Sequence, residues 1–287
     1  MKKYDVIIIG SGIAGISASI YLKRSNKSVL IIESNVVGGQ LNRSSIIENY
    51  PGYTSIDGPS LAYNLYNQVN NLGIEYLYEE VTSVDFDKNI VNTSNNNIEY
   101  KYLIIATGRS PRKLDILNDY VGNGVSYCAL CDGNLYKNKD VMVIGGGDVA
   151  FEEALYLSNI VNSVIILNRS NHLRAEQKEQ IKVKETKNIK VINNEEINNI
   201  SYNDDKFNIN NKYIVDGIFV CIGYVPNSKI FDLKKENDYI LVDNHFKTNI
   251  NNVYAVGDVI KKDIYQLVSA SYDGVSAAVD IINKDQK

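Results

Sequence analysis

The sequence predicts an α/β protein with two nucleotide-binding domains, each built around a parallel sheet. The chain has 287 residues, a length that exceeds what one hydrophobic core usually serves. An apolar strand pattern that leads into a glycine-rich turn and a helical pattern occurs near the N-terminus and again near the middle of the chain. Because this unit is the nucleus of a three-layer dinucleotide-binding domain, its repetition indicates two such domains.

The first unit begins with Tyr4 to Ile9, a largely β-branched run typical of a strand buried on both faces of a parallel sheet. The GxGxxG turn Gly10-Ser11-Gly12-Ile13-Ala14-Gly15 follows, and a second apolar strand, Val29 to Ile32, ends at Glu33. Such glycines let backbone N–H groups approach a pyrophosphate, while the acid accepts hydrogen bonds from ribose hydroxyls. The unit therefore predicts a dinucleotide site.

Three further segments are expected near this site. Gly38-Gly39-Gln40-Leu41 and Glu48-Asn49-Tyr50-Pro51-Gly52 contain residues that allow close backbone approach or carry an amide able to bond a ring system. The apolar strand Tyr102 to Ala106 ends in Thr107-Gly108. Open α/β sheets bind ligands at the carboxyl ends of their strands, so we expect this end to face the ligand.

The second unit repeats the pattern from Val141 onward. The strand Val141 to Ile144 leads into the GxGxxA turn Gly145-Gly146-Gly147-Asp148-Val149-Ala150, and Val164 to Leu167 is the next strand. The position of the ribose acid is occupied by Asn168, with Arg169 beside it. A carboxylate would repel a 2′-phosphate and a guanidinium can pair with one, so this exchange favours NADPH over NADH. Both predicted domains are thus Rossmann-like.

The remaining segments indicate how the domains are connected. Ile189 to Val215 alternates short β-like runs with turns and could hold a small hairpin, and Asp216 to Cys221 reads as a further strand. The last strand, Val253 to Val256, leads to Gly257-Asp258, and the apolar pattern from Gln266 to Ile282 suits a closing helix. We expect this final block to return and complete the first domain, which would make that domain discontinuous.

The stretch Ser126-Tyr127-Cys128-Ala129-Leu130-Cys131-Asp132-Gly133 is the predicted redox centre. Two cysteines separated by two residues can close a small disulfide, and an adjacent acid can move the protons that disulfide chemistry requires. Half of a zinc site is the competing interpretation, but the other candidate ligands, Cys221, His172 and His245, are scattered singly. Cys221 lies in an apolar strand and is expected to pack in a core.

Composition excludes several function classes. The net charge of −4 offers no basic field for nucleic acid. The apolar run near the N-terminus is too short for a signal peptide or a membrane span. Three cysteines do not make a secreted disulfide framework. We therefore expect a cytoplasmic protein that does not bind a membrane.

The motifs, in this order, resemble those of the low-molecular-weight thioredoxin reductases, flavoproteins of the pyridine-nucleotide disulfide oxidoreductase group. The match runs nearly end to end and includes Gly124 to Gly133 and Phe219 to Gly223 with Pro226-Asn227. The resemblance implies an FAD domain from residues 1–112 and 243–287, an inserted NAD(P)H-type domain from residues 113–242, and a homodimer. It also implies a reaction in which a hydride passes from NADPH to flavin, the CxxC disulfide is reduced, and the electrons reach thioredoxin.

The resemblance assigns roles to individual residues. Cys131 would face the flavin, Cys128 would attack the partner disulfide, and Asp132 would be the acid/base. The implied FAD-binding residues are Gly10, Ser11, Gly12, Ile13, Ala14, Gly15, Glu33, Gly38, Gly39, Gln40, Leu41, Asn49, Val81, Thr107, Gly108, Gly257, Asp258, Gln266 and Leu267. The implied NADPH-binding residues are Gly145, Gly147, Asp148, Val149, Ala150, Arg169 and Arg174, and no metal is expected.

The chain departs from the family pattern at three places. Val149 replaces a small hydroxyl residue, and the segment from Asn168 to Arg174 keeps two arginines of a phosphate clamp while losing its histidine and its second arginine. Tyr265 stands where an arginine usually precedes Gln266. Because the phosphate clamp is altered, NADH and reduced ferredoxin remain alternative electron donors. If ferredoxin is the donor, it is a protein partner in addition to thioredoxin. A hypothesis from another class is a non-enzymatic flavin- or nucleotide-binding protein whose CxxC is structural.

Overall fold

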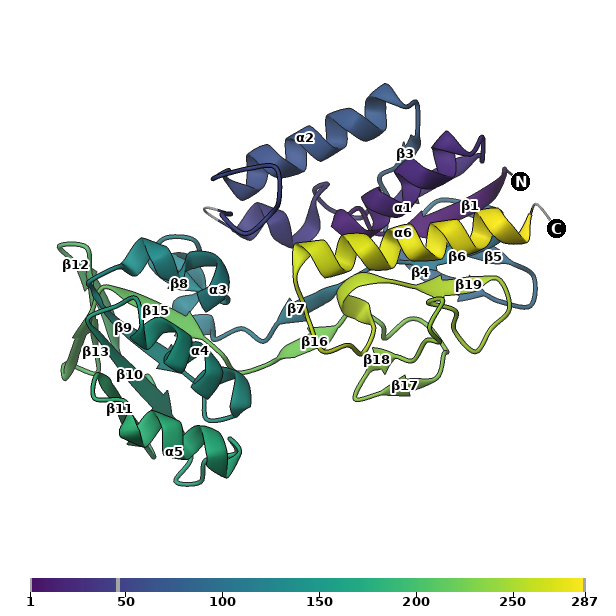
Figure 1. Ribbon diagram of the computed structural model, residues 1–287. Helices are drawn as coiled ribbons and strands as arrows, with labels where there is room; N and C mark the ends of the chain where they lie inside the picture. Colours follow the sequence, from purple (N-terminus) through teal and green to yellow (C-terminus); the bar gives the residue numbers. More distant parts are fainter. Residues whose placement is uncertain (1, 45–46, 286–287) are drawn as a thin grey trace. The chain divides into compact units, whose positions relative to one another are not determined.

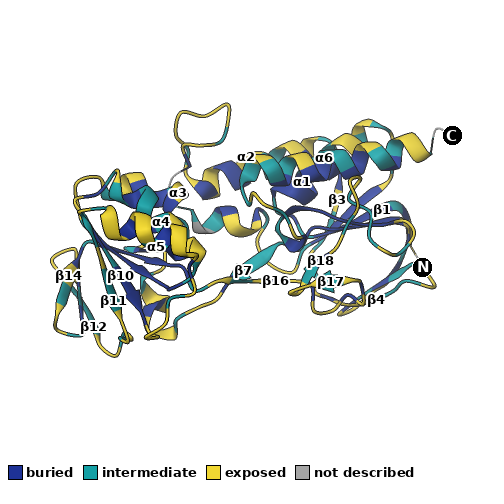
Figure 2. Cartoon of the chain, turned by 60° about the horizontal axis from the view of Figure 1, so that its bottom comes forward, coloured by how far each residue is buried: buried dark blue, intermediate teal, exposed yellow. Residues whose placement is uncertain are grey.

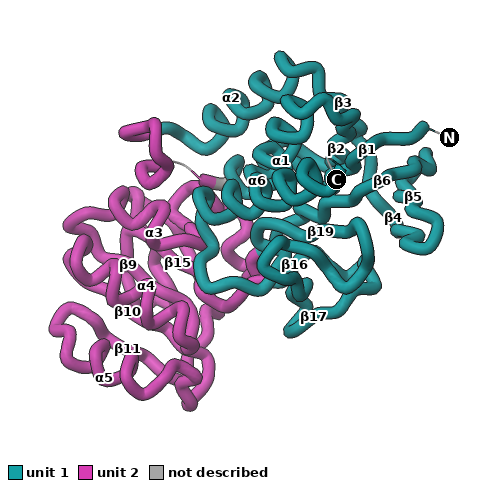
Figure 3. Tube along the Cα trace, turned by 45° about the vertical axis from the view of Figure 1, so that its right-hand side comes forward, with its two compact units in different colours: residues 1–42, 56–110, 225–287 teal, residues 43–55, 111–224 magenta. Residues whose placement is uncertain are grey.

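The computed structural model describes residues 2–44 and 47–285, so residues 1, 45–46 and 286–287 of the expected FAD domain lie outside the described residues. The chain divides into two compact units, coloured separately in Figure 3. The first comprises residues 1–42, 56–110 and 225–287, and the second comprises residues 43–55 and 111–224. Each unit contains a sheet whose central strands are parallel (Figure 1), and the predicted α/β class with two Rossmann-like domains is confirmed.

The first unit is organised around a seven-stranded sheet in the order β3-β2-β1-β6-β5-β4, in which β19 also pairs with β6. Strands β1, β2, β3, β6 and β19 run parallel, whereas β4 and β5 are antiparallel to their neighbours. The elements are β1 (Lys3–Ile9), α1 (Ile13–Arg24), β2 (Val29–Ile32), α2 (Gly58–Asn71), β3 (Glu75–Leu77), β4 (Val81–Asp85), β5 (Ile90–Thr93), β6 (Asn97–Ile105), β17 (Lys235–Glu236), β18 (Tyr239–Ile240), β19 (Val253–Ala255) and α6 (Leu267–Lys284).

The C-terminal segment completes this first sheet, as its pairing shows. Val253 of β19 lies opposite Leu103 of β6 in parallel register. Helix α6 packs closely on α1, because a Cβ added at Gly274 would lie 2.1 Å from the carbonyl oxygen of Ala14. The closing helix expected from the sequence is therefore present, and it packs against the first helix of the chain.

Residues 225–242 belong to the first unit, whereas the sequence analysis grouped them with the middle segment. Phe231, Leu233 and Ile240 are buried in the same apolar cluster as Ile7 and Leu103 of the first sheet. The chain thus returns to the first unit after Tyr224. Burial of these three side chains in that cluster is the physical reason for the difference.

The second unit contains a five-stranded parallel sheet in the order β11-β10-β9-β15-β8. The region expected to hold a hairpin contributes the edge strand β11 and a separate three-stranded antiparallel sheet, β12-β13-β14. The elements are β8 (Val125–Ser126), α3 (Ala129–Asp132), β9 (Asp140–Ile144), α4 (Asp148–Ser158), β10 (Ser163–Asn168), α5 (Gln177–Glu185), β11 (Ile189–Asn193), β12 (Ile200–Asn203), β13 (Lys206–Ile209), β14 (Tyr213–Val215) and β15 (Gly217–Val220). Where the chain passes between the units, β7 (Arg109–Pro111) pairs with β16 (Tyr224–Pro226).

Within each unit the central strands of the sheet are buried, and the helices are partly exposed to solvent. The central strands β2, β9 and β15 are buried and appear dark blue in Figure 2, while the helices also show exposed residues in yellow. Strand β2 is buried along its whole length, as expected for a strand covered on both faces. Within the described ranges, no helix is long and apolar enough to cross a membrane.

The two nucleotide-type turns lead into helices that each have a glycine at the N-cap. Helix α2 begins at Asp57, whose side chain accepts a hydrogen bond from Ser60 N at 2.8 Å, and α6 begins with a capping box formed by Gln266 and Ser269. Helices α1 and α4 begin instead at Gly12 and Gly147, which supply no side-chain cap. The first N–H groups of these two helices are therefore left for a ligand or solvent.

Candidate active site and nucleotide-binding turns

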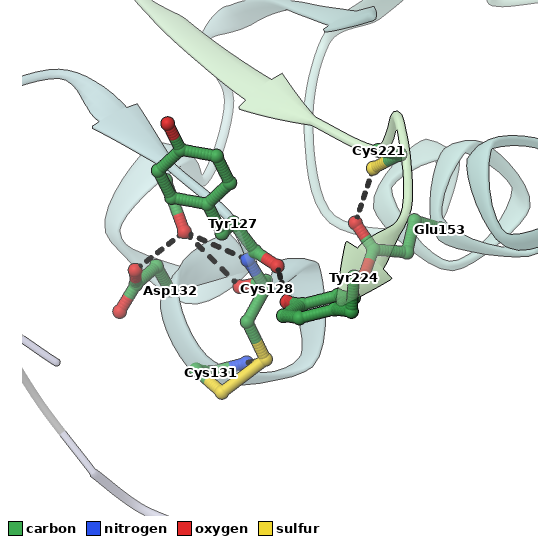
Figure 4. Close-up of a disulfide and its surroundings, with 8 residues drawn as sticks. Tyr127, Cys128, Cys131, Asp132, Glu153, Cys221 and Tyr224 are labelled. Atoms are coloured by element: carbon green, nitrogen blue, oxygen red, sulfur yellow. Dashed lines mark hydrogen bonds between the residues drawn. A yellow bond between two sulfur atoms is a disulfide. The ribbon is translucent and has the colours of Figure 1, made fainter. Parts of the chain in front are cut away.

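The predicted redox stretch forms a disulfide between Cys128 and Cys131, with the two Cα atoms 5.3 Å apart. Cys128 follows the short strand β8, and Cys131 lies in the single turn of helix α3 (Figure 4). The backbone N–H of Cys131 donates to Cys128 Sγ at 3.2 Å. Both cysteines are half-buried, whereas Leu130 between them is exposed. A disulfide in such a position can exchange with a thiol from outside.

The acid beside the disulfide is held by a serine to which the sequence analysis gave no role. Ser126 Oγ donates to Asp132 Oδ2 at 2.6 Å, and the same hydroxyl accepts a hydrogen bond from Cys128 N at 3.1 Å. Both Ser126 and Asp132 are buried. Nearby, burial and then the negative charge of Asp132 raise the pKa of Tyr136 to about 12. The carboxylate is therefore fixed in a desolvated place connected to the disulfide turn.

The third cysteine has a defined partner. Cys221 follows β15 and is buried, as the sequence predicted, but its Sγ donates to Glu153 Oε2 on α4 at 2.8 Å (Figure 4). Burial and the neighbouring Glu153 charge raise the pKa of the Cys221 thiol well above its usual value. Close by in sequence, the Tyr224 hydroxyl donates to the Tyr127 carbonyl at 2.6 Å and so holds the strand that leads into the disulfide.

The first glycine-rich turn brings several expected residues together. The Glu33 carboxylate accepts hydrogen bonds from Ser11 N and Ser11 Oγ at 2.9 and 2.7 Å. Gly38 N donates to Ser11 O at 2.9 Å, which places the Gly38–Gln40 loop against the turn. A Cβ added at Gly15 would lie 2.1 Å from Gly10 O, so only glycine allows α1 to pack this close to the turn.

Other expected residues gather at the carboxyl ends of the neighbouring strands. Thr107 and Gly108 follow β6, and a Cβ added at Gly10 would lie 2.5 Å from Ala106 O just before them. Gly257 and Asp258 follow β19, and a Cβ added at Gly257 would lie 2.9 Å from the Ala14 side chain. The ends of β1, β6 and β19 thus form one edge, as parallel strands in one sheet require.

Five expected FAD-binding residues lie in other parts of the structure. Leu41 is buried in a 3₁₀ turn, and Leu267 begins α6 directly after the capping residue Gln266. Val81 begins β4 and is buried in the cluster that contains Ile32, the residue before Glu33. Asn49 lies in the segment 43–55, which groups with the second unit.

The second glycine-rich turn is closed around Asn168. This residue is buried, and its amide donates to Ser170 O at 2.8 Å, His172 O at 3.3 Å and Asn193 Oδ1 at 3.1 Å. The amide N–H groups of Asn168 therefore hold the loop after β10 in place and are not available to bind a ribose. Arg174 N donates to Gly146 O at 2.7 Å, which ties the end of the same loop to the turn.

The candidate coenzyme side chains around this turn are exposed. Arg169 and Arg174 are both exposed, and within residues 2–44 and 47–285 neither takes part in an ion pair. Val149 is 49% exposed in the first turn of α4, and the Asp148 carboxylate accepts a hydrogen bond from Glu176 N at 2.7 Å. The two guanidinium groups therefore remain accessible to an anion.

Two dinucleotide-type turns and a disulfide paired with a buried acid are the parts of a nucleotide-dependent disulfide oxidoreductase. The family model for pyridine nucleotide-disulphide oxidoreductases matches residues 4–274, and the chain belongs to this family. It is 35% identical over 297 residues to the thioredoxin reductase of Bacillus subtilis (strain 168), covering 98% of this chain and 94% of that protein.

Solved structures agree with this similarity. The crystal structure of thioredoxin reductase from Streptococcus pyogenes MGAS5005 matches with a TM-score of 0.91 and 34% identity, covering 99% of this chain and 98% of the other. Thioredoxin reductase from Giardia duodenalis matches with a TM-score of 0.91 and 30% identity, covering all of both chains. The resemblance seen in the motifs is confirmed, and a non-enzymatic binding protein is not favoured.

Proposed function

We propose that this chain is an FAD-dependent thioredoxin reductase that takes electrons from NADPH. The observation that carries the proposal is the half-buried Cys128–Cys131 disulfide joined through Ser126 to the buried Asp132. A buried acid connected to an accessible disulfide provides both the thiol chemistry and the proton handling that disulfide reduction requires. The similarity to thioredoxin reductases supports thioredoxin as the partner.

The first turn fits the diphosphate and ribose of FAD. A Cβ at Gly12 would meet nothing within 4 Å, so there is open space at the uncapped start of α1. The N–H groups there would hold the pyrophosphate, and Glu33, fixed by Ser11, would accept from ribose hydroxyls. FAD supplies two-electron transfer between a nicotinamide and a disulfide. The edge formed by Thr107, Gly108, Gly257 and Asp258 would bind the rest of the cofactor.

The second turn fits the diphosphate of a nicotinamide nucleotide. A Cβ at Gly147 would also meet nothing within 4 Å, and α4 likewise begins without a side-chain cap. The exposed Arg169 and Arg174 would pair with a 2′-phosphate, which favours NADPH over NADH. The pyridine nucleotide in the family description favours a nicotinamide donor over ferredoxin.

The cysteines have distinct roles in the proposed thiol step. After the disulfide is reduced, the Cys128 thiolate attacks one sulfur of the thioredoxin disulfide and the other thioredoxin sulfur leaves as a thiolate. Cys131 then attacks the mixed disulfide, which releases reduced thioredoxin and reforms Cys128–Cys131. The dithiol thus loses two electrons and two protons, and thioredoxin gains both. The hydrogen bond from Cys131 N to Cys128 Sγ favours a thiolate on Cys128.

Asp132 moves the protons in this proposal. Its carboxylate accepts the proton of a cysteine thiol as the thiolate forms and returns it to the leaving thiolate. Ser126 keeps the carboxylate in place through its 2.6 Å hydrogen bond. A homodimer and a cytoplasmic location complete the proposal, and both rest on the family resemblance and the composition.

The donor is tested by anaerobic titration of the FAD-loaded protein with NADPH, NADH and reduced ferredoxin in parallel. The expected result is rapid bleaching of the flavin absorbance by NADPH and slow bleaching by the other two. Rapid bleaching by ferredoxin alone would reject the nicotinamide donor. Cys131→Ser should abolish thioredoxin reduction while FAD stays bound, and retained turnover in that variant would reject the disulfide mechanism.

A further inference from the structure

A charged cluster lies at the strand ends of the first unit, around the expected FAD-binding residue Asp258. Arg109, the first residue of β7, places its Nε 3.5 Å from Asp258 Oδ2. Its guanidinium carbon lies 3.7 Å from the centre of the Tyr265 ring. The side chains of Arg109 and Asp258 are only 15% and 21% exposed. Arg109 is therefore held between an anion and an aromatic face in a largely desolvated place.

A second cation contacts the other oxygen of the same carboxylate. Lys262 Nζ lies 3.3 Å from Asp258 Oδ1 and 2.8 Å from Asp273 Oδ2. Asp273 is buried, which raises the pKa of its carboxyl, and it also accepts from Gly257 N at 3.2 Å. Asp258 thus has one cation at each oxygen, and Lys262 is shared with a second acid. Arg109 contacts the oxygen of Asp258 that Lys262 does not contact.

Contacts of both its backbone and its side chain hold Arg109 in place. Its backbone carbonyl accepts a hydrogen bond from Gln40 Nε2 at 2.7 Å. Its planar guanidinium stacks on Tyr265, an arrangement that a lysine ammonium cannot reproduce. Tyr265 immediately precedes Gln266, the residue that caps α6. The stack therefore joins the strand ends after β6 and β19 to the start of α6, three segments that carry expected FAD residues.

We propose that Arg109 is a positioning residue of the FAD site that acts through Asp258. Its guanidinium holds the Asp258 carboxylate in one orientation, ready to accept hydrogen bonds from cofactor hydroxyls. The guanidinium reaches the face of the Tyr265 ring from β7, so Arg109 also contacts the residue just before α6. The inference rests on the proposed function, because it assumes that this edge binds FAD.

The test measures FAD binding to the apo-protein by quenching of flavin fluorescence and by the circular dichroism of the bound flavin. Arg109→Ala should raise the FAD dissociation constant about tenfold, which corresponds to about 1.4 kcal/mol, and should change the dichroism. Arg109→Lys should give an intermediate loss, because the charge remains without the planar stack. The double variant Arg109→Ala with Tyr265→Arg should recover most of the affinity, because it returns a guanidinium to the same space.

A double-mutant cycle separates positioning from simple structural support. If Arg109 acts through Asp258, Arg109→Ala should add almost nothing in an Asp258→Asn background. Additive losses would overturn the inference, as would wild-type affinity in Arg109→Ala. Lys3→Ala removes an exposed ion pair with Glu99 in the same sheet and is the matched control, expected to keep wild-type affinity.

The outcomes for folding and for the proposed function are distinguishable. Thermal midpoints of the apo-proteins identify any variant that does not fold. If Arg109→Ala fails to fold, the cycle is run with Arg109→Lys, and wild-type affinity in that variant overturns the need for the stack. If the wild-type apo-protein does not bind FAD, the proposed function fails. If it binds and Arg109 has no influence, only the inference about Arg109 fails.

Discussion

The Ser126 hydroxyl and the Asp132 carboxylate form a buried hydrogen bond of 2.6 Å across the disulfide turn. The same hydroxyl accepts from the backbone N–H of Cys128, so one serine connects the proposed acid/base to the proposed nucleophile. The disulfide turn is therefore a unit of at least four residues, Ser126, Cys128, Cys131 and Asp132, rather than two cysteines with an adjacent acid. A serine that can donate and accept at once is suited to this place.

This relationship predicts the effect of removing the hydroxyl. Ser126→Ala should lower kcat for thioredoxin reduction about tenfold, a fraction of what a general acid contributes, and should shift the pH–rate profile. Ser126→Thr keeps the hydroxyl and should retain more activity than the alanine variant. The measurement is steady-state turnover across pH at saturating donor and thioredoxin. An unchanged pH profile in Ser126→Ala would show that the serine only supports the fold.

The three cysteines should differ in reactivity. The native oxidised protein should offer no thiol to an alkylating reagent, because Cys128 and Cys131 are paired and Cys221 is buried with a raised pKa. Mild reduction should expose two thiols, and only denaturation should expose the third. Mass spectrometry of the alkylated protein counts them. Cys221→Ser is the control, and fast alkylation of Cys221 in the native protein would contradict its burial.

The exposed arginines beside the second turn should set coenzyme preference. Arg169→Ala and Arg174→Ala should each raise KM for NADPH about tenfold, the value of one charge-assisted hydrogen bond. KM for NADH should stay near the wild-type value, since NADH lacks the 2′-phosphate. Lys187→Ala, an exposed cation in the same unit, is the matched control. Equal losses with both coenzymes would mean that the arginines do not contact the 2′-phosphate.

Asp285 should make the stability of the first unit depend on pH. Burial alone would raise the pKa of Asp285, but hydrogen bonds from Lys101, Lys27 and Tyr102 outweigh it and lower the pKa from 3.8 to about 2. A lowered folded-state pKa stabilises the protein above the unfolded value of 3.8, and this stabilisation is lost as the pH falls toward 2.

Asp285→Asn tests this dependence. The variant should lose about 1 to 3 kcal/mol of stability at neutral pH, because hydrogen bonds to a charged group are weakened. Thermal melts from pH 7 down to pH 2 should show the difference from wild type shrinking below about pH 4. A difference that stays constant across this range would assign the effect to packing at the end of α6 rather than to charge.

Local patterns explain why much of the fold could be predicted. A strand, a glycine turn and a helix follow one another within about 30 residues, so their spacing is visible in the chain itself. This spacing assigns Glu33 to the first turn, and in the structure its carboxylate accepts a hydrogen bond from Ser11 N. The sequence also shows that Asn168 replaces the acid in the second unit. It does not show that the Asn168 amide donates to Ser170 O and so holds the loop after β10.

Contacts between residues that lie far apart in the sequence could not be predicted from it. Cys221 was expected to be an ordinary core residue, yet it donates to Glu153, 68 positions away. Pro226-Asn227 belongs to the family match but does not show which unit residues 225–242 join. Burial of Phe231 and Ile240 in the first core does. Ser126 lies in the predicted redox stretch, which marks it as a candidate. Its hydrogen bond to Asp132 could not be predicted from the spacing of the two residues.

The two dinucleotide-type domains, the redox pair Cys128 and Cys131 and the family could be predicted from the sequence, because all three depend on residues close together in the chain. The contacts of Arg109 with Tyr265 and Asp258 become visible only in the folded protein. The physical reason is that β6 and β19 are neighbours in the sheet although about 150 residues of chain separate them, and a sheet places its strand ends together whatever their order in sequence.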